Sequence, residues 1–313
     1  MGIPTIITVS RMIRIDRIRA AAERARPHIL RTPMIPVEGA LLKLECLQPT
    51  GSFKVRGFFA AALGLEPAKL RRGLITVSAG NAAQACAYVA NSLGVSCRVF
   101  MFDTAPPPKL EGVKRWGATP VLMPRDEILE WMAKEGWNNE PETFIHPFAE
   151  PEVMAGHGGL GLELLEDVPD LVRVLVPVGG GGLIGGIASA IKGVRPEVEV
   201  IGVQSDGYPS WTRSFEAGAP VSIQPDTIAD GTSAPVDQRA FELLKECVDR
   251  WLTVPEPRLL AAISELASAA KVVAEGAGAL TYAALEQLEP GPSTVAVVSG
   301  GNIDPKLLAR LLS

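Results

Sequence analysis

Short runs of apolar, mostly β-branched residues alternate along the chain with longer segments that carry apolar residues at helical spacing. The short runs are typical of strands buried in a parallel sheet, and they lie at 74–77, 96–102, 119–123, 172–178, 198–203 and 295–298. The helical segments lie at 82–93, 108–116, 183–192, 241–247 and 257–268. This alternation predicts an α/β protein of open twisted sheets with flanking helices, which binds ligands at the carboxyl ends of its strands.

Turn-forming residues cluster at two places, 66–68 and 136–151, and interrupt the periodic pattern there. Each cluster predicts a crossing between two domains. We therefore expect a large domain built from residues 1–68 and 147–313, and a small domain formed by residues 69–146. A cleft between the two domains is the expected ligand site.

The charge balance of the 313 residues, a net charge of -5 without a long basic run, argues against nucleic acid or an anionic membrane as a partner. A small molecule is the expected ligand. Residues 1–12 lack the basic segment and cleavage site of a secretory signal. The uncharged stretch 174–191 contains Pro177 and four consecutive glycines, so we do not expect it to span a membrane.

The four cysteines are widely spaced and lack a C-x-x-C pair, which favours reduced thiols in a cytoplasmic protein. The three histidines do not show the spacing of zinc ligands, so no metal site is expected.

Lys54 lies in the segment GSFKVRG at 51–57, just inside the start of a predicted helix. The positive end of the helix macrodipole disfavours a cation there and pushes the lysine toward its neutral form. A neutral amine is what Schiff-base chemistry with an aldehyde cofactor requires. The simpler interpretation is a solvated lysine that follows a Ser52 cap.

Four glycines, Gly179, Gly180, Gly181 and Gly182, follow the strand 172–178 and precede a helix that begins at Leu183. Bare backbone amides at a helix start suit a phosphate. The stretch also fits G-x-G-x-x-G through Gly185, so a nicotinamide-dependent oxidoreductase is the competing interpretation. That fold needs an acidic residue at the end of the next strand, whereas the strand ending at 203 is followed by Gln204 and Ser205. Asp206 comes two positions late, which weakens this alternative.

Two further turns carry small polar residues after a predicted strand, at 78–81 and at 299–302. The first opens a helix at Ala82 and would suit a substrate carboxylate. Taken alone, Asn81 is more simply a helix N-cap. Three strand ends with such residues predict one shared cleft.

Ordered segments covering nearly the whole chain resemble the fold-type II pyridoxal-phosphate enzymes, in particular the threonine/serine dehydratases (ammonia-lyases) and serine racemases. They include KLECLQPTGSFKVRG, SAGNAAQ, VPVGGGGLIGGIA, VVAEGAGAL and SGGNID. The resemblance implies a tryptophan synthase β-like fold with pyridoxal 5'-phosphate bound to the large domain and the substrate on the side of the small domain. It also implies a homodimer or larger homo-oligomer.

The resemblance also implies roles for individual residues. Lys54 would form the Schiff base and remove the α-proton, and the other cofactor contacts would be Phe53, Asn81, Ser299, Gly179, Gly180, Gly181, Gly182 and Leu183. The substrate carboxylate would be surrounded by Ser78, Ala79, Gly80, Asn81 and Ala82. Gly231 and Glu275 are candidate pocket residues, although a helix cap or an ion pair accounts for Glu275 equally well.

The implied reaction is α,β-elimination from L-threonine or L-serine, which yields a 2-oxo acid and ammonia. A neutral Ser299 beside the pyridine nitrogen limits carbanion stabilisation and therefore favours elimination. Ala79 stands where the racemases have a serine as second acid/base, so racemisation is the weaker alternative, and β-replacement also stays open. The carboxylates of the family's divalent-metal site align with Gln204 and Ser210, so no such site is expected.

Overall fold

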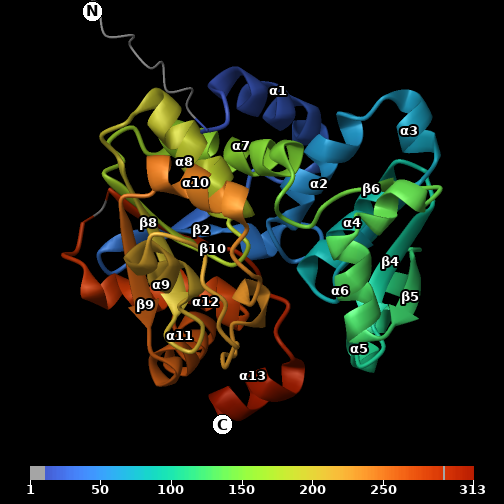
Figure 1. The fold of residues 1–313 in the computed structure, drawn as a ribbon. Helices are drawn as coiled ribbons and strands as arrows, with labels where there is room; N and C mark the ends of the chain where they lie inside the picture. The colour runs from blue at the N-terminus through green and yellow to red at the C-terminus, as the bar shows by residue number, and fades with distance from the viewer. Residues whose placement is uncertain (1–10, 292) are drawn as a thin grey trace, which may run out of the picture.

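The computed structural model describes residues 11–291 and 293–313 and contains two sheets flanked by helices (Figure 1). The larger sheet has the strand order β1-β2-β10-β7-β8-β9 and the smaller one the order β5-β4-β3-β6. The strands of the larger sheet are β1 (Met34–Val37), β2 (Ala40–Leu44), β7 (Arg173–Pro177), β8 (Glu199–Ser205), β9 (Arg250–Val254) and β10 (Thr294–Val298). Those of the smaller sheet are β3 (Leu74–Val77), β4 (Cys97–Phe102), β5 (Thr119–Met123) and β6 (Thr143–Phe144).

Among the described residues, β1 and β2 pair antiparallel and the other strand pairs are parallel. The α/β class with open sheets and flanking helices is therefore confirmed. All six predicted strands are present, with ends shifted by one or two residues at most. The pattern missed β1, β2, β6 and β9, because they are short or only partly buried and so lack a continuous apolar run.

Thirteen α-helices cover the sheets within the described residues. They are α1 (Ile15–Ala25), α2 (Lys54–Leu63), α3 (Pro67–Arg71), α4 (Asn81–Ser92), α5 (Pro107–Lys114), α6 (Arg125–Ala133), α7 (Pro151–Asp167), α8 (Gly182–Val194), α9 (Ser210–Ala217), α10 (Gln238–Cys247), α11 (Glu256–Ser268), α12 (Gly276–Ala283) and α13 (Pro305–Leu312). The five predicted helices correspond to α4, α5, α8, α10 and α11.

The two predicted turn clusters contain regular secondary structure. The first contains the start of α3, because proline is compatible with the first turn of a helix. The second contains the short strand β6. Residues 1–10, which make up most of the segment judged to lack a secretory signal, lie outside the described residues. In the described ranges, no helix combines the length and the hydropathy needed to cross a membrane.

Helix α7 packs between α2 and α8 at glycines that bring the backbones into contact. A Cβ atom at Gly156 of α7 would lie 2.6 Å from the Arg56 carbonyl oxygen of α2. A Cβ atom at Gly186 of α8 would lie 2.1 Å from the Met154 carbonyl oxygen of α7. The three helices therefore pack more closely than larger side chains would allow.

We expect Gly186→Ala to lower the free energy of unfolding by more than about 2 kcal/mol, because the new methyl group overlaps the backbone of α7. Chemical denaturation measures this change. Gly193→Ala is the matched control in the same helix, since its Cβ would meet Ile15 at an ordinary 3.6 Å. Equal effects of the two substitutions would contradict the close approach.

Candidate active site

Lys54 and the three predicted turns come together at the carboxyl ends of β3, β7 and β10. Phe53, which precedes Lys54, donates its backbone N–H to the Ser299 carbonyl oxygen at 3.0 Å. The Asn302 side chain donates to Asn81 Oδ1 at 2.7 Å and thereby joins the turn after β10 to the turn after β3. The glycine loop lies against Phe148, whose neighbour Pro147 accepts a hydrogen bond from Lys54. Residues from distant parts of the sequence thus lie close together.

Lys54 is the first residue of α2. Its Nζ donates to the Pro147 carbonyl oxygen at 3.0 Å and lies 5.0 Å from the centroid of the Phe53 ring. Burial lowers the pKa of the Lys54 amine to about 8, partly offset by the Glu275 carboxylate. The sequence interpretation attributed the lowering to the helix terminus, whereas in the structure the main cause is the loss of hydration.

The interpretation of Lys54 as a solvated residue behind a Ser52 cap is wrong. The residue at the cap position is Phe53, and no side chain caps this helix. Ser52 Oγ is buried, as is Thr50 Oγ1, and neither atom has a hydrogen-bond partner among the described residues. Buried hydroxyls without a partner are uncommon in proteins. Polar groups therefore remain available beside Lys54.

The glycine loop follows β7 and leads into α8, which begins at Gly182, one residue before the predicted start. Gly181 has a φ of 84°, in the left-handed region that favours glycine. Side chains at Gly180 and Gly181 would overlap the rings of Phe148 and Trp211. The loop therefore fits against its neighbours only as bare backbone, with amides at a helix start where an anion is favoured.

The turn after β3 differs from the simple capping interpretation. Gly80 occupies the cap position of α4, and Asn81 is the first helical residue. The Asn81 side chain donates from Nδ2 to Glu275 Oε1 at 2.6 Å. Asn81 is therefore not an N-cap, and the structure brings it together with Glu275.

Glu275 is buried at the cap position of α12, but its side chain does not cap the helix. Burial, reinforced by the Asp230 carboxylate, raises the pKa of Glu275 to about 7, although the hydrogen bond from Asn81 opposes this shift. The helix-cap interpretation of Glu275 is therefore wrong, and the carboxyl group instead accepts a hydrogen bond from Asn81. Nearby Gly231 is exposed, and a Cβ atom there would lie 3.8 Å from Glu275 Oε1.

The residues predicted to surround the substrate carboxylate line the start of α4. Ser78 Oγ accepts the Gly80 N–H at 3.0 Å, Ala79 is half-buried and Ala82 is buried. Among the described atoms, none lies within 4 Å of the position of a Cβ atom at Gly80. Space is therefore open beside Gly80.

An exposed ion pair, which the sequence did not reveal, links helix α5 to the segment that precedes Gly231. Lys109 of α5 lies 2.9 Å from the Asp230 carboxylate, next to Gly231.

Sequence reasoning also missed the hydrogen-bond partners of Lys54 and Asn81, which are the Pro147 carbonyl and the Asn302 side chain. The Pro147 carbonyl is a backbone group and has no residue-type signal, whereas Asn302 was visible in the third turn.

Pyridoxal phosphate matches this set of residues. Lys54 supplies an amine with a lowered pKa for its aldehyde, and the glycine loop supplies amides for its phosphate. Phe53 and Asn81 remain available for its ring. Ser299 Oγ, which is buried and makes only a long contact of 3.5 Å with the Ala277 carbonyl, is available for the ring nitrogen.

Gln204 and Ser210, which align with the family's metal-binding carboxylates, contact one another. Gln204 Nε2 donates to Ser210 Oγ at 3.2 Å, and Gln204 Oε1 accepts the Trp211 N–H at 2.8 Å. This position is therefore occupied by neutral hydrogen-bonding groups.

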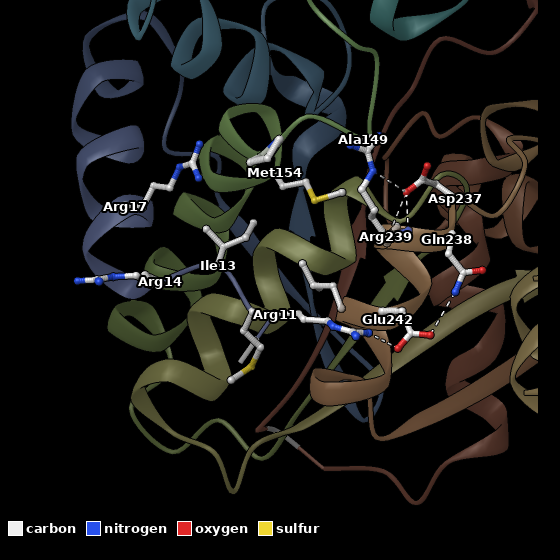
Figure 2. Close-up of a pocket in the computed structure, with 14 residues that line it drawn as sticks. Arg11, Ile13, Arg14, Arg17, Ala149, Met154, Asp237, Gln238, Arg239 and Glu242 are labelled. Carbon is white, nitrogen blue, oxygen red and sulfur yellow. Dashed lines mark hydrogen bonds and ion pairs between the residues drawn. The ribbon is translucent and has the colours of Figure 1, made fainter. Parts of the chain in front are cut away.

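A cavity of about 830 Å³ lies apart from the predicted site, among α1, α7 and α10 (Figure 2). Apolar residues such as Ile13, Met154 and Leu243 form part of its lining, together with charged residues. Its wall shares Ala240 with the back of the glycine loop, because the Ala240 Cβ lies 3.4 Å from where a Gly181 Cβ would be. None of the predicted site residues is among the described residues that line it.

The fold and the pairing of a buried lysine with a glycine loop define a pyridoxal-phosphate-dependent enzyme of fold type II. Comparison with known proteins agrees, since residues 25–300 match the family described as "Pyridoxal-phosphate dependent enzyme". The chain belongs to this family, and its cofactor is pyridoxal phosphate.

Relatives share much of the chain. It is 42% identical over 279 residues to an L-threonine ammonia-lyase of Thermotoga maritima, covering 87% of this chain and 69% of that protein. It is 37% identical over 320 residues to the "L-threonine dehydratase catabolic TdcB" of Staphylococcus aureus, covering 95% of this chain and 91% of that protein.

Solved structures show the same architecture. A maize serine racemase superposes with a TM-score of 0.89 at 30% identity, covering 95% of this chain and 96% of that chain. A threonine deaminase of T.th. superposes with a TM-score of 0.85 at 37% identity, covering 93% of this chain and 99% of that chain. The family resemblance found in the sequence is therefore confirmed.

The position of Asp206, which the sequence pattern offered as an argument against the nicotinamide alternative, differs in the structure. Strand β8 ends at Ser205, so Asp206 follows it directly and is not two positions late. Asp206 instead accepts the backbone N–H of Glu256 at 3.3 Å. The family membership, and not the position of this acidic residue, excludes the nicotinamide interpretation.

In the cofactor-free protein, removal of the Lys54 amine should raise the free energy of unfolding. A protonated Lys54 destabilises the fold fully below about pH 8, and this cost disappears as the pH rises toward 10.5. Lys54→Met should therefore raise the free energy of unfolding by about 1–3 kcal/mol below that pKa, and by progressively less at higher pH. Lys134→Met, at an exposed lysine, is the control. If denaturation over this pH range gave the same change for both variants, the burial of the Lys54 amine would be contradicted.

Proposed function

We propose that this protein is a pyridoxal-phosphate-dependent dehydratase that converts a 3-hydroxy amino acid, L-threonine or L-serine, to a 2-oxo acid and ammonia. The observation that carries the proposal is the Lys54 amine, held at the start of α2 with a pKa lowered to about 8. The relatives and structures named as threonine ammonia-lyase, dehydratase or deaminase support the choice of reaction.

Each part of the cleft has a proposed role. When bound, pyridoxal phosphate supplies an aldehyde for the lysine amine and a ring that takes up electrons from the substrate α-carbon. Lys54 removes the α-proton, a step that requires its neutral form. The amides of Gly179, Gly180, Gly181, Gly182 and Leu183 hold the phosphate, and Phe53, Asn81 and Ser299 contact the ring.

The substrate is held from the side of the smaller sheet. Ser78, Ala79, Gly80, Asn81 and Ala82 surround its carboxylate, where the start of α4 favours negative charge. Ala79 has no hydroxyl that could return a proton to the opposite face of the α-carbon. Elimination is therefore favoured over racemisation, even though serine racemases are among the similar structures.

We also propose an organisation for the chain. Residues 1–68 and 147–313 form a large cofactor-binding domain, and residues 69–146 form a small domain on the substrate side. This division is supported by the two sheets, whose strands fall on either side of these boundaries. The protein acts as a homodimer or larger homo-oligomer in the cytoplasm, which the family resemblance and the reduced cysteines support.

Lys54→Ala should abolish the visible absorption of the bound cofactor and lower the release of 2-oxo acid and ammonia from L-threonine by more than about 10³-fold, because the amine that reacts with the aldehyde is lost. Absorption spectra and a 2-oxo-acid assay test both effects. Lys134→Ala should retain both signals. Turnover by the Lys54 variant close to that of the unmutated enzyme would overturn the proposal.

Ala79→Ser should create measurable racemase activity, because a hydroxyl at this position would face the substrate from the side opposite Lys54. Chiral chromatography of L-serine reaction mixtures detects D-serine, and exchange of the α-proton with deuterated water gives a second readout. Ala82→Ser is the control for adding a hydroxyl nearby. A variant that still forms no D-serine would contradict the position assigned to Ala79.

A further inference from the structure

The side chain of Asn81 has one defined orientation. Its Oδ1 accepts from Asn302 Nδ2 at 2.7 Å, and its Nδ2 donates to Glu275 Oε1 at 2.6 Å. An asparagine amide has one oxygen acceptor and two N–H donors. The oxygen and one N–H are therefore engaged, and one N–H donor is left for a ligand.

The partners on both sides oppose a flip of this amide. Asn302 Nδ2 also donates to the Thr50 carbonyl oxygen at 2.8 Å, so its own orientation is fixed. Above its pKa of about 7, the Glu275 carboxyl group is ionised and can only accept hydrogen bonds. A flipped Asn81 would place oxygen against oxygen on one side and N–H against N–H on the other, which loses both bonds.

The backbone around Asn81, Glu275 and Asn302 leaves room for the Glu275 carboxylate. A Cβ atom at Gly300 would lie 2.3 Å from Glu275 Oε1, so a larger residue there would displace the carboxyl group. The Glu275 backbone N–H donates to the Gly300 carbonyl oxygen at 3.1 Å. The turn after β10 thus holds both Asn302 and Glu275 in place beside Asn81.

Several charged groups act on Glu275. Asp230 raises the pKa of its carboxyl group, whereas Lys109 and the Asn302 backbone lower it, and Lys54 of α2 is also close enough to interact with it. A buried carboxyl group in such surroundings is costly unless it is hydrogen-bonded. Because the Asn81 amide donates to this carboxylate, the orientation of the amide and the carboxylate stabilise each other.

We propose that Glu275 and Asn302 are positioning residues that fix Asn81 as a hydrogen-bond donor toward the ring oxygen of the cofactor. The proposal rests on the proposed contact of Asn81 with that ring. An N–H donor stabilises the deprotonated ring oxygen, whereas an amide carbonyl in its place would favour the protonated one. Glu275 and Asn302 thereby set the protonation state of the cofactor without touching it.

The test uses two variants that act on the same amide from opposite sides, Glu275→Gln and Asn302→Leu. Glutamine can donate to Asn81 Oδ1, and leucine cannot donate at all, so each change removes the restraint on one side of the amide and lowers the cost of the flip. In the holoenzyme without substrate, we expect the ratio of visible to near-ultraviolet absorption to fall in each variant. Pyridoxal phosphate should bind each apoprotein about tenfold more weakly, as measured by fluorescence titration, which is the size of one hydrogen bond.

Glu286→Gln, at an exposed ion pair with Arg258, is the control for the charge change and should leave the spectrum unaltered. Circular dichroism establishes that each variant is folded, and either variant alone decides the question if the other does not fold. If the unmutated enzyme absorbs visible light but a folded variant shows the same absorption ratio, this inference is overturned and the proposed function is not affected. A failure of the unmutated enzyme to absorb after addition of pyridoxal phosphate would overturn the proposed function as well.

Discussion

The active-site geometry depends on the close packing of α7 between α2 and α8. A Cβ atom at Gly57 of α2 would lie 2.7 Å from the Val153 carbonyl oxygen of α7, and Gly186 brings α8 comparably close on the other side. Helix α2 begins at Lys54 and α8 begins at the glycine loop. Because α7 fixes the spacing of both helices, it also fixes the distance between the Lys54 amine and the amides of the glycine loop.

Buried charged residues hold the start of α2 in place. Arg56 lies two residues after Lys54, and its guanidinium contacts the carboxylates of Glu45 and Glu163 at 2.7 Å each. Burial raises the pKa of the Glu45 carboxyl, but Arg56 outweighs this effect and holds the pKa below its ordinary value. Removal of one partner from such a network leaves an uncompensated buried charge, which makes the start of α2 difficult to move.

Much of the fold and part of the site could be predicted from the sequence. The strands of the sheet interiors are continuous apolar runs, and Lys54 and the glycine loop lie within local motifs. The edge strand β9 was missed because its residues are only partly buried. The cap at Asn81 was misjudged because α4 begins at Asn81 itself, whose side chain donates to Glu275, 194 residues away. Backbone groups such as the Pro147 carbonyl leave no trace in residue type, so only three-dimensional structure reveals them.

The open space beside Gly80 has a consequence for how this enzyme can diversify. The residue is not in the left-handed region, having a φ of -119°. Described atoms leave the position of its Cβ clear, and the residue adjoins the proposed substrate carboxylate. Position 80 is therefore a site where an added side chain would have room to change substrate selectivity.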